Sequence, residues 1–301
     1  MFELASALTD QAGLGKLQSI TPVIGQGQVN QVFIVETDQS KVVLRLNDIT
    51  EYDRFIKEQW CADITASEGV PGASVLKVGR HDNHAYTFVE YIEGSNGKSI
   101  QPTTQLWGKL GAQLRLIHNV ETDGFGEQLS DITNGRQQQW NDYLAYNISS
   151  LTDTDKLVEI GVLDTGSSKS LKTVFEKLAS TEFVFGLNHG DYSLANVIVD
   201  KGSQPHIIDW GSAQAHVVPH HDLGVILDEG LHERSEEFAA LLSGYGMNRD
   251  QFNVIRSDIR ALQLLEAVDK LRWALDKSPD RIDHHKNKLA ELLRVREVSD
   301  M

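Results

Sequence analysis

The segment that most constrains this chain is residues 188–211, in which two short β-branched runs are joined by a glycine-containing turn. This pattern predicts a β-hairpin. Asp191 and Asn196 lead into the first predicted strand, and Asp209 leaves the second. Because paired antiparallel strands bring the start of one beside the end of the other, we expect Asn196 and Asp209 to meet in space. Two oxygen ligands side by side, with a third carboxylate nearby, predict a site for a hard cation such as Mg²⁺.

The spacing of these residues matches the catalytic loop of kinases. His189, Asp191 and Asn196 stand where that loop carries a histidine, the aspartate that accepts the proton of the substrate hydroxyl, and a metal-binding asparagine. Asp209-Trp-Gly stands where those enzymes carry Asp-Phe-Gly. The alternative is that these are ordinary turn residues beside a hairpin, because Asn, Asp and Gly are common in turns.

With His-Gly-Asp at 189–191 and Asp-Trp-Gly at 209–211, the chain resembles the aminoglycoside phosphotransferase family, whose members have a protein-kinase-like fold and phosphorylate small molecules. The resemblance spans nearly the whole chain. It implies that Asp191 is the catalytic base, that Asn196 and Asp209 hold Mg²⁺, and that ATP is the co-substrate. Gly190 replaces the arginine that senses a phosphorylated activation loop in many protein kinases, which argues against a protein substrate.

The composition restricts the partners of the chain. Its 301 residues include 28 Lys and Arg against 43 Asp and Glu, a net charge of −15. Such a charge repels nucleic acid and anionic membranes and attracts cations, although acidity also serves solubility alone. The single cysteine, Cys61, excludes an internal disulfide and suits a reducing compartment. Without a signal peptide or a run of roughly 18 apolar residues, we expect a cytoplasmic protein with no membrane partner. These features do not indicate an oligomeric state.

Gly25 and Gly27 lie between two β-branched runs, Ile20–Ile24 and Val32–Glu36, and predict a glycine turn between strands. Without a Cβ, such a turn lets backbone N–H groups approach phosphate oxygens. Gly-x-Gly alone is also typical of a plain hairpin turn. Its position ahead of the kinase-like loop favours a nucleotide-binding turn.

Arg45 lies in the third predicted strand, Lys41–Leu46, where protein kinases carry a lysine that pairs with nucleotide phosphates and with a glutamate on a helix. An arginine makes the same charge pairing with bidentate geometry, and the family that the chain resembles tolerates arginine there. Lys41 is the alternative cation, at the outer end of the strand. Glu58, in the helix predicted over residues 52–68, is the expected partner of Arg45, unless it is an ordinary surface glutamate.

Two more strands are expected at residues 74–78 and 85–91. The resemblance makes the end of the second strand a hinge between lobes, with the Glu90 carbonyl and the Ile92 N–H contacting adenine and Phe88 at the back of the pocket. A strand end followed by a glycine turn is the alternative for Glu90 and Ile92. The resemblance also assigns three branched aliphatic residues to the nucleotide pocket: Val43, Ile198 and Ile208.

After Gly94 the pattern becomes helical, and His118 is expected to close one helix in a structural role. Residues 248–295 predict two long amphipathic helices. Four of their residues are expected in the core: Leu262, Leu265, Val268 and Trp273. Five acidic residues between 228 and 237 are expected to face either a cationic acceptor or solvent.

His189 is expected to pack beneath the catalytic loop and to fix Asp191 in position. Asp222 resembles the aspartate with which family members brace that loop, and a simple helix N-cap is the alternative. Three further histidines match no standard zinc-ligand spacing, so metal binding there is disfavoured: His216, His220 and His221.

Together these observations predict a two-lobed α+β fold of the protein-kinase type. Residues 1–93 form a nucleotide-binding lobe with an antiparallel sheet and one helix, and residues 94–301 form a mainly helical catalytic and acceptor-binding lobe. The predicted activity is transfer of the γ-phosphate of ATP to a hydroxyl group of a small molecule, aminoglycoside-like or another cationic metabolite. A nucleotide-binding pseudoenzyme that serves as a scaffold is the alternative. A protein kinase is disfavoured further, because the Asp209-to-Asp222 interval is short for a regulated activation loop.

Overall fold

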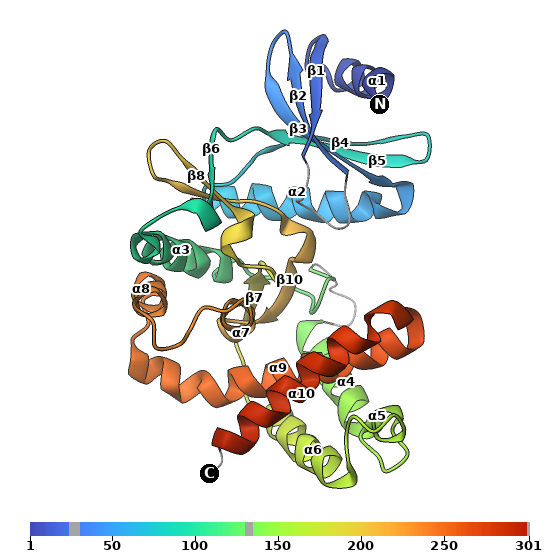
Figure 1. Cartoon of the computed structure of the whole chain (residues 1–301), viewed down its shortest axis with the longest axis vertical. Coiled ribbons are helices and arrows are strands. Elements are labelled where there is room, and N and C mark those ends of the chain that lie inside the picture. The colour runs from blue at the N-terminus through green and yellow to red at the C-terminus, as the bar shows by residue number, and fades with distance from the viewer. Residues whose placement is uncertain (24–30, 130–134, 300–301) are drawn as a thin grey trace.

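The molecule has an N-terminal region built on one antiparallel sheet and a C-terminal region that is mainly helical, the first above the second in Figure 1. The computed structural model describes residues 1–23, 31–129 and 135–299. Gly25 and Gly27 of the predicted phosphate turn lie outside the described residues. The predicted α+β, two-lobed architecture is confirmed.

The N-terminal sheet has the strand order β1-β2-β3-β5-β4, with all neighbours antiparallel. The elements of this region are α1 (Phe2–Ala12), β1 (Leu17–Pro22), β2 (Gln31–Thr37), β3 (Lys41–Asp48), η1 (Ile49–Glu51), α2 (Tyr52–Ser67), β4 (Val75–His81) and β5 (His84–Glu90). Gly13 ends α1 in the left-handed conformation that favours glycine.

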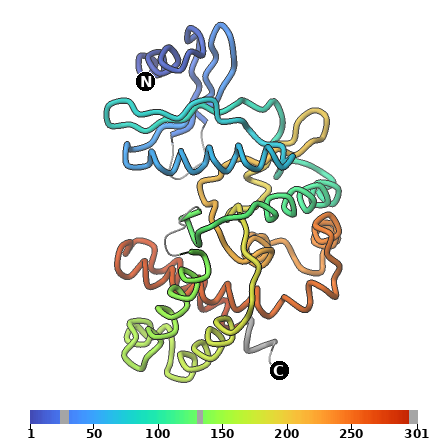
Figure 2. The backbone as a smooth tube through the Cα atoms, turned by 180° about the vertical axis from the view of Figure 1, so that it is seen from behind, coloured from blue at the N-terminus to red at the C-terminus, as the bar shows by residue number. Residues whose placement is uncertain are grey.

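The two faces of this sheet have different partners. On one face, Leu8 of α1 shares a buried cluster with Leu44 and Phe88. On the other side lies α2, between the sheet and the helical region in Figures 1 and 2. Cys61 and Ala62 of α2 belong to a core that is shared with the helical region. Burial raises the pKa of the Cys61 thiol to about 12, so Cys61 is a packed thiol of the core.

In the described residues, the C-terminal region consists of eight α-helices, α3 to α10, around two small antiparallel sheets, β6-β8-β9 and β7-β10. Its elements are β6 (Gly94–Asn96), η2 (Gly97–Ser99), α3 (Thr103–His118), α4 (Arg136–Ser150), α5 (Lys156–Glu159), α6 (Thr165–Ala179), β7 (Phe185–Asn188), η3 (Leu194–Asn196), β8 (Val197–Asp200), β9 (Pro205–Ile207), η4 (Trp210–Ser212), β10 (Gln214–Val217), α7 (His220–Asp228), α8 (Glu236–Tyr245), α9 (Arg249–Lys277), η5 (Pro279–Arg281) and α10 (Ile282–Ser299).

The two long C-terminal helices are present as α9 and α10. Leu262, Leu265 and Val268 are buried as predicted, but Trp273 is 48% exposed, so its assignment to the core was wrong. At 100° per residue, Trp273 lies about 140° around the helix from Val268, whereas Leu271 continues the buried stripe. Among the described helices, none has the length and apolar composition that a membrane span requires.

Candidate active site

The hairpin predicted around the catalytic loop is formed by β8 and β9. The two strands pair antiparallel with Val197 opposite Ile207, and the Ile208 N–H donates to the Asn196 carbonyl at 3.0 Å. Asn196 therefore enters the hairpin at the same end at which Asp209 leaves it. The local signal was sufficient because both strands and their turn lie within a dozen residues of one another.

The Asn196 side chain is held against Asp191. Its Nδ2 lies 2.9 Å from the Asp191 carbonyl oxygen and 2.8 Å from Asp191 Oδ2. An ionised carboxylate only accepts hydrogen bonds, so the amide must turn its NH₂ toward Asp191. The Asn196 Oδ1 oxygen then faces away from Asp191 and is available as a ligand.

Asp209 occupies an unusual backbone conformation. Its φ of 64° and ψ of 73° are left-handed, a region that non-glycine residues seldom adopt and that is found often at functional sites. Its side chain is half-exposed, and its Oδ1 accepts from Arg45 Nη2 at 3.2 Å. The next residue, Trp210, is buried with its ring 4.8 Å from that of His189, so its role is packing.

Arg45 forms the expected ion pair with Glu58. Arg45 Nη1 contacts Glu58 Oε2, and Arg45 Nη2 lies 3.4 Å from Glu58 Oε1. Glu58 is only 5% exposed, which excludes the surface alternative. Lys41, the alternative cation, instead pairs with Glu36 at the exposed end of β3, at 3.2 Å.

Burial and charge act against each other in this pair. Burial raises the pKa of the Glu58 carboxyl, and the Arg45 charge opposes that rise. Burial alone would lower the pKa of Arg45, but the charges of Glu58 and Asp209 outweigh it and raise that pKa. The guanidinium therefore stays charged between two carboxylates.

A second cation of α2 contacts the segment that follows Asp209. Lys57 Nζ donates to the Ala213 carbonyl oxygen at 2.9 Å and to the Gly211 carbonyl oxygen at 3.5 Å. The sequence did not single out Lys57, because nothing local marks a lysine whose partners are carbonyl groups far along the chain.

Asp222, which is fully buried, holds the backbone at the start of the catalytic loop. Its Oδ2 accepts from the His189 N–H at 2.9 Å, and its Oδ1 accepts from the Gly190 N–H at 2.8 Å. This is the bracing contact that the resemblance implies. Pro219, not Asp222, is the N-cap of α7, so the N-cap alternative is excluded.

Asp222 also lies 3.1 Å from His118 Nε2, a partner that the sequence did not predict. Burial alone would raise the pKa of Asp222, but its hydrogen bond with His118 and the nearby histidines outweigh burial and lower that pKa to about 2. His118 is also 3.0 Å from the Tyr245 hydroxyl. His118 is therefore structural, as expected, and its role is to hold the carboxylate beneath the loop.

His189 is buried beneath the loop with both ring nitrogens occupied. The Asp191 N–H donates to His189 Nδ1 at 3.3 Å, so Nδ1 carries no proton and Nε2 donates to the Ile208 carbonyl at 3.1 Å. Gly190 has a φ of +76°, and a Cβ there would lie 2.1 Å from the Ser212 carbonyl oxygen. Only glycine satisfies both the conformation and the close approach at this position.

Phe88 was predicted at the back of the nucleotide pocket, and the structure shows this to be wrong. Phe88 pairs with Leu44 and is buried in the cluster beneath α1. Arg45 pairs with Thr87, and Val43 pairs with Val89. Because successive side chains in a strand point to opposite faces, Val89 shares the face of Arg45 and Phe88 does not.

The other predicted nucleotide contacts occupy the following positions. Val43 lies on the Arg45 face of β3. Ile198 and Ile208 are half-buried and alternate with Val197 and Ile207, which are buried in the core. Glu90 is the last residue of β5, and Ile92 lies in the connection to β6.

The acidic run at 228–237 is partly used within the fold. Glu233 pairs with Arg256 at 2.8 Å and with Arg260 at 3.1 Å, and Asp228 pairs with Lys288 at 2.8 Å. These two acids therefore support helix packing, which weakens the interpretation of this run as an acceptor site.

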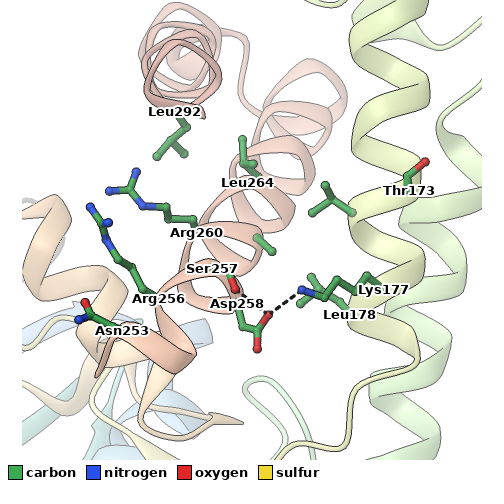
Figure 3. Close-up of a pocket in the computed structure, with 12 residues that line it drawn as sticks. Thr173, Lys177, Leu178, Asn253, Arg256, Ser257, Asp258, Arg260, Leu264 and Leu292 are labelled. Carbon is green, nitrogen blue, oxygen red and sulfur yellow. Dashed lines mark hydrogen bonds and ion pairs between the residues drawn. The ribbon is translucent and has the colours of Figure 1, made fainter. Parts of the chain in front are cut away.

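Figure 3 shows a pocket elsewhere in the helical region, with a volume of about 490 Å³ between α6, α9 and α10. Apolar side chains such as Leu178 and Leu264 line it, and Lys177 of α6 points toward Asp258 of α9 at 3.8 Å. No residue of the catalytic loop lines this pocket, so it is separate from the candidate active site.

Comparisons with known proteins agree with this geometry. A model of the phosphotransferase enzyme family matches residues 21–256. No curated protein matches the chain. Among solved structures, the ternary complex of an aminoglycoside phosphotransferase APH(4)-Ia mutant with ADP and hygromycin B is 20% identical, with coverage of 96% of this chain and 97% of that chain and a TM-score of 0.62.

Two further structures show the same fold. The GDP and kanamycin complex of APH(2")-IIia is 16% identical over 98% of this chain and 99% of that chain, with a TM-score of 0.69. A protein assigned as a fructosamine-3-kinase, from Haemophilus somnus 129PT, is 12% identical over 96% of each chain, with a TM-score of 0.63. The family match covers more than half of the chain and includes the hairpin with Asp191, Asn196 and Asp209. The chain therefore belongs to the phosphotransferase enzyme family, as its motifs predicted.

Proposed function

We propose that this phosphotransferase moves the γ-phosphate of ATP to a hydroxyl group of a small molecule. The observation that carries the proposal is the placement of Asp191, Asn196 and Asp209 at one end of a single hairpin, with Arg45 bonded to Asp209. Phosphoryl transfer needs positioning and charge neutralisation more than covalent chemistry. This arrangement supplies an acceptor-orienting carboxylate, two oxygen ligands and a cation.

The donor set fits Mg²⁺, which prefers carboxylate and amide oxygens. Asn196 would bind through Oδ1, because its NH₂ is turned toward Asp191. Asp209 would bind through Oδ2, because its Oδ1 accepts from Arg45. When bound, Mg²⁺ neutralises charge on the nucleotide phosphates.

Asp191 is the group that we assign to the acceptor hydroxyl. Its Oδ2 is held by Asn196, and its backbone N–H is held by His189 Nδ1, so the carboxylate has a fixed orientation. It would accept the hydroxyl proton as the oxygen attacks the phosphorus. His189 has both nitrogens engaged and would position Asp191 without exchanging protons.

Binding of the nucleotide is assigned to the N-terminal lobe, residues 1–93, and to the face of the catalytic lobe that follows it. Arg45, paired with Glu58, would contact the phosphates. The glycines 25 and 27 would supply backbone N–H groups, and the backbone of Glu90 and Ile92 would contact adenine. Val43, Ile198 and Ile208 would supply apolar contacts, and we add Val89 on the Arg45 face. Support for a nucleotide co-substrate comes from similar structures that hold ADP or GDP.

The acceptor is proposed to be a small cationic molecule with a free hydroxyl. Similar structures hold hygromycin B or kanamycin, and one belongs to a protein assigned as a fructosamine-3-kinase. The net charge of −15 favours attraction of a cation to the protein. We expect the reaction to take place in the cytoplasm, where ATP and Mg²⁺ are supplied.

The test is ADP release from Mg·ATP with pools of hydroxyl-bearing amines, sugars and antibiotics. Asp191→Asn is measured in parallel, because it keeps the shape of the side chain and removes the carboxylate. We expect turnover with one pool, loss of that turnover by roughly 100-fold or more in Asp191→Asn, and unchanged nucleotide affinity. Full turnover in Asp191→Asn would refute the assignment of the base. Absence of Mg·ATP binding by the wild-type protein would refute the proposed function as a whole.

A further inference from the structure

A second cluster of possible metal ligands lies in the helical region, apart from Asn196 and Asp209. His216 comes from β10, His221 from α7 and Glu266 from α9, and these elements lie together in the catalytic lobe in Figure 1. The two imidazole rings stack with centroids 4.3 Å apart. His221 Nδ1 lies 2.5 Å from Glu266 Oε1. Two consecutive elements, β10 and α7, and the remote helix α9 therefore bring two imidazoles and one carboxylate together.

The distances allow one cation to contact all three groups. One ligand atom from each residue lies within 4.8 Å of the others. Around tetrahedral Zn²⁺, with bonds of about 2.0–2.1 Å, ligand atoms lie about 3.4 Å apart. Binding of a cation would draw the ligand atoms closer together than this limit of 4.8 Å, and both histidines are buried.

One atom in the cluster lacks the partner that a buried polar group normally has. His216 Nδ1 is buried and has no hydrogen-bond partner among the described residues. An imidazole nitrogen without a protein partner, on a histidine stacked against a second histidine, is the expected state of an unused ligand.

Neighbouring side chains also match the surroundings of a metal ligand. The Gln214 side-chain amide nitrogen, Nε2, lies 2.6 Å from His221 Nε2, and exchanging the amide's N and O positions by a 180° turn would bring its oxygen there instead. With Nδ1 on a cation, Nε2 would carry the proton and the amide oxygen would accept it, which is how ligating imidazoles are oriented in metalloproteins. Glu266 Oε2 bonds Lys270, whose side chain is 61% exposed, and Oε1 contacts His221 Nδ1, a contact that a bound cation would replace by coordinating both atoms.

We propose that His216, His221 and Glu266 bind a divalent transition-metal cation of the Zn²⁺ class, with a fourth position open to water. Two nitrogen donors and one oxygen donor distinguish this site from the all-oxygen site at Asn196 and Asp209, which suits Mg²⁺. The cation joins β10, α7 and α9 as a structural crosslink. His221 immediately precedes Asp222, so the crosslink also supports the residue on which the catalytic loop rests.

The zinc interpretation was disfavoured from the sequence because the spacing of the three histidines matches no standard pattern. The structure gives the reason. His220 packs against Phe183, with ring centroids 5.4 Å apart, and is not part of the cluster. The third ligand is Glu266, which no local pattern connects with the histidines.

The experiment uses the full chain, stripped of metal by a chelator that is then removed by dialysis. Titration with Co²⁺ is followed by visible absorption, because four-coordinate Co²⁺ absorbs far more strongly than hexa-aqua Co²⁺. Titration with Zn²⁺ is followed by calorimetry. We expect one equivalent of Co²⁺ with the intense spectrum and one tight Zn²⁺ site. Mg²⁺ in excess should not displace either ion.

Two variants and two matched controls locate the site. Glu266→Gln and His216→Gln should each weaken Zn²⁺ binding by roughly 10- to 100-fold. His220→Gln removes a buried histidine that lies on α7, as His221 does, but outside the cluster. His285→Gln removes one ring of a histidine pair on α10. Both controls should bind Zn²⁺ like the wild type. Unchanged affinity in Glu266→Gln and His216→Gln, or loss of the site in His285→Gln, would overturn the proposal.

The wild-type spectrum decides the question if a variant fails to fold, as judged by circular dichroism. An intense four-coordinate spectrum at one equivalent, with a higher melting temperature in Zn²⁺, supports the site. A weak six-coordinate spectrum, or no binding below about 100 μM, overturns it. Neither readout depends on phosphotransferase activity. Failure of the metal-site proposal can therefore be distinguished from failure of the proposed function.

Discussion

Asp222→Asn tests whether one buried carboxylate holds the catalytic loop in place. Asp222 accepts from the backbone N–H groups of His189 and Gly190 and contacts His118. Asparagine has nearly the same shape, but its NH₂ must face a group that also donates. Hydrogen bonds to a charged group contribute about 1.5–3 kcal/mol each. We expect the free energy of unfolding to fall by about 2–4 kcal/mol.

The dependence of stability on acid pH gives a second value for the free energy that the Asp222 carboxylate contributes to folding. The pKa of Asp222 is about 2 in the folded protein, against an ordinary value of 3.8. A carboxylate whose pKa is lowered by folding stabilises the folded state above its unfolded pKa, and this contribution is lost as the pH falls through its folded pKa. At about 1.4 kcal/mol per pH unit, the difference corresponds to about 2 kcal/mol. The stability gap between wild type and Asp222→Asn should therefore narrow between about pH 4 and pH 2.

Urea unfolding, followed by far-ultraviolet circular dichroism from about pH 7 to pH 2.5, measures both effects. Asp228→Asn is the matched control. It removes a carboxylate of the same helix, but burial raises the pKa of Asp228, so this variant should not reproduce the narrowing in acid. A gap of zero at pH 7, or one that stays constant into acid, would refute the role assigned to Asp222.

Three further predictions concern the candidate active site. Arg45→Ala should lower the free energy of unfolding by about 3 kcal/mol in denaturant titrations, because it leaves the buried Glu58 carboxylate unpaired. Arg45→Lys should restore part of this free energy, and unchanged stability in Arg45→Ala would contradict the buried ion pair of Arg45 and Glu58. Phe88→Ala should lower the free energy of unfolding by about 3–5 kcal/mol without changing the affinity for Mg·ATP measured by calorimetry, whereas Val89→Trp should weaken that affinity about tenfold. The reverse pattern would mean that Phe88, not Val89, lines the nucleotide pocket. Gly190→Ala should destabilise the protein by at least about 2 kcal/mol and reduce turnover, because of its clash with the Ser212 carbonyl oxygen, and a fully active variant would contradict this.

The features that the sequence predicted well are local. The hairpin that places Asn196 and Asp209 together depends on two strands and a turn within one short segment, so pattern and pairing rules were sufficient. The ion pair between Arg45 and Glu58 needed the resemblance as well, because the strand and the helix were predictable separately but their contact was not. The prediction that Phe88 lines the nucleotide pocket was wrong for a different reason. Residues 85–88 are all buried, so β5 lacks the alternation of polar and apolar residues that indicates which face a side chain occupies.

The contacts that the sequence could not predict join residues that are remote along the chain. His118 and Asp222 are 104 residues apart, and no local pattern links them. The same holds for Glu266 beside His221, and for Lys57 beside Ala213. Buried polar groups must find partners, but the identity of each partner is decided by how the helices pack. Trp273 shows the converse, since an apolar residue off the buried stripe of its helix remains exposed.

The contacts between α2 and the segment 209–213 have a mechanical consequence. Arg45, Glu58 and Lys57 attach this segment to α2 through two ion pairs and two hydrogen bonds to carbonyl groups. If the lobes rotate to admit substrate and release product, segment 209–213 must either travel with α2 or break these bonds. The first route keeps these bonds but separates Trp210 from His189 and Ser212 from Gly190, whereas the second keeps that packing and breaks the bonds to α2. On the first route, Asp209 would move with the N-terminal lobe, and Asp191 and Asn196 would stay with the catalytic lobe. Opening of the lobes would then separate the two cation ligands, Asn196 and Asp209.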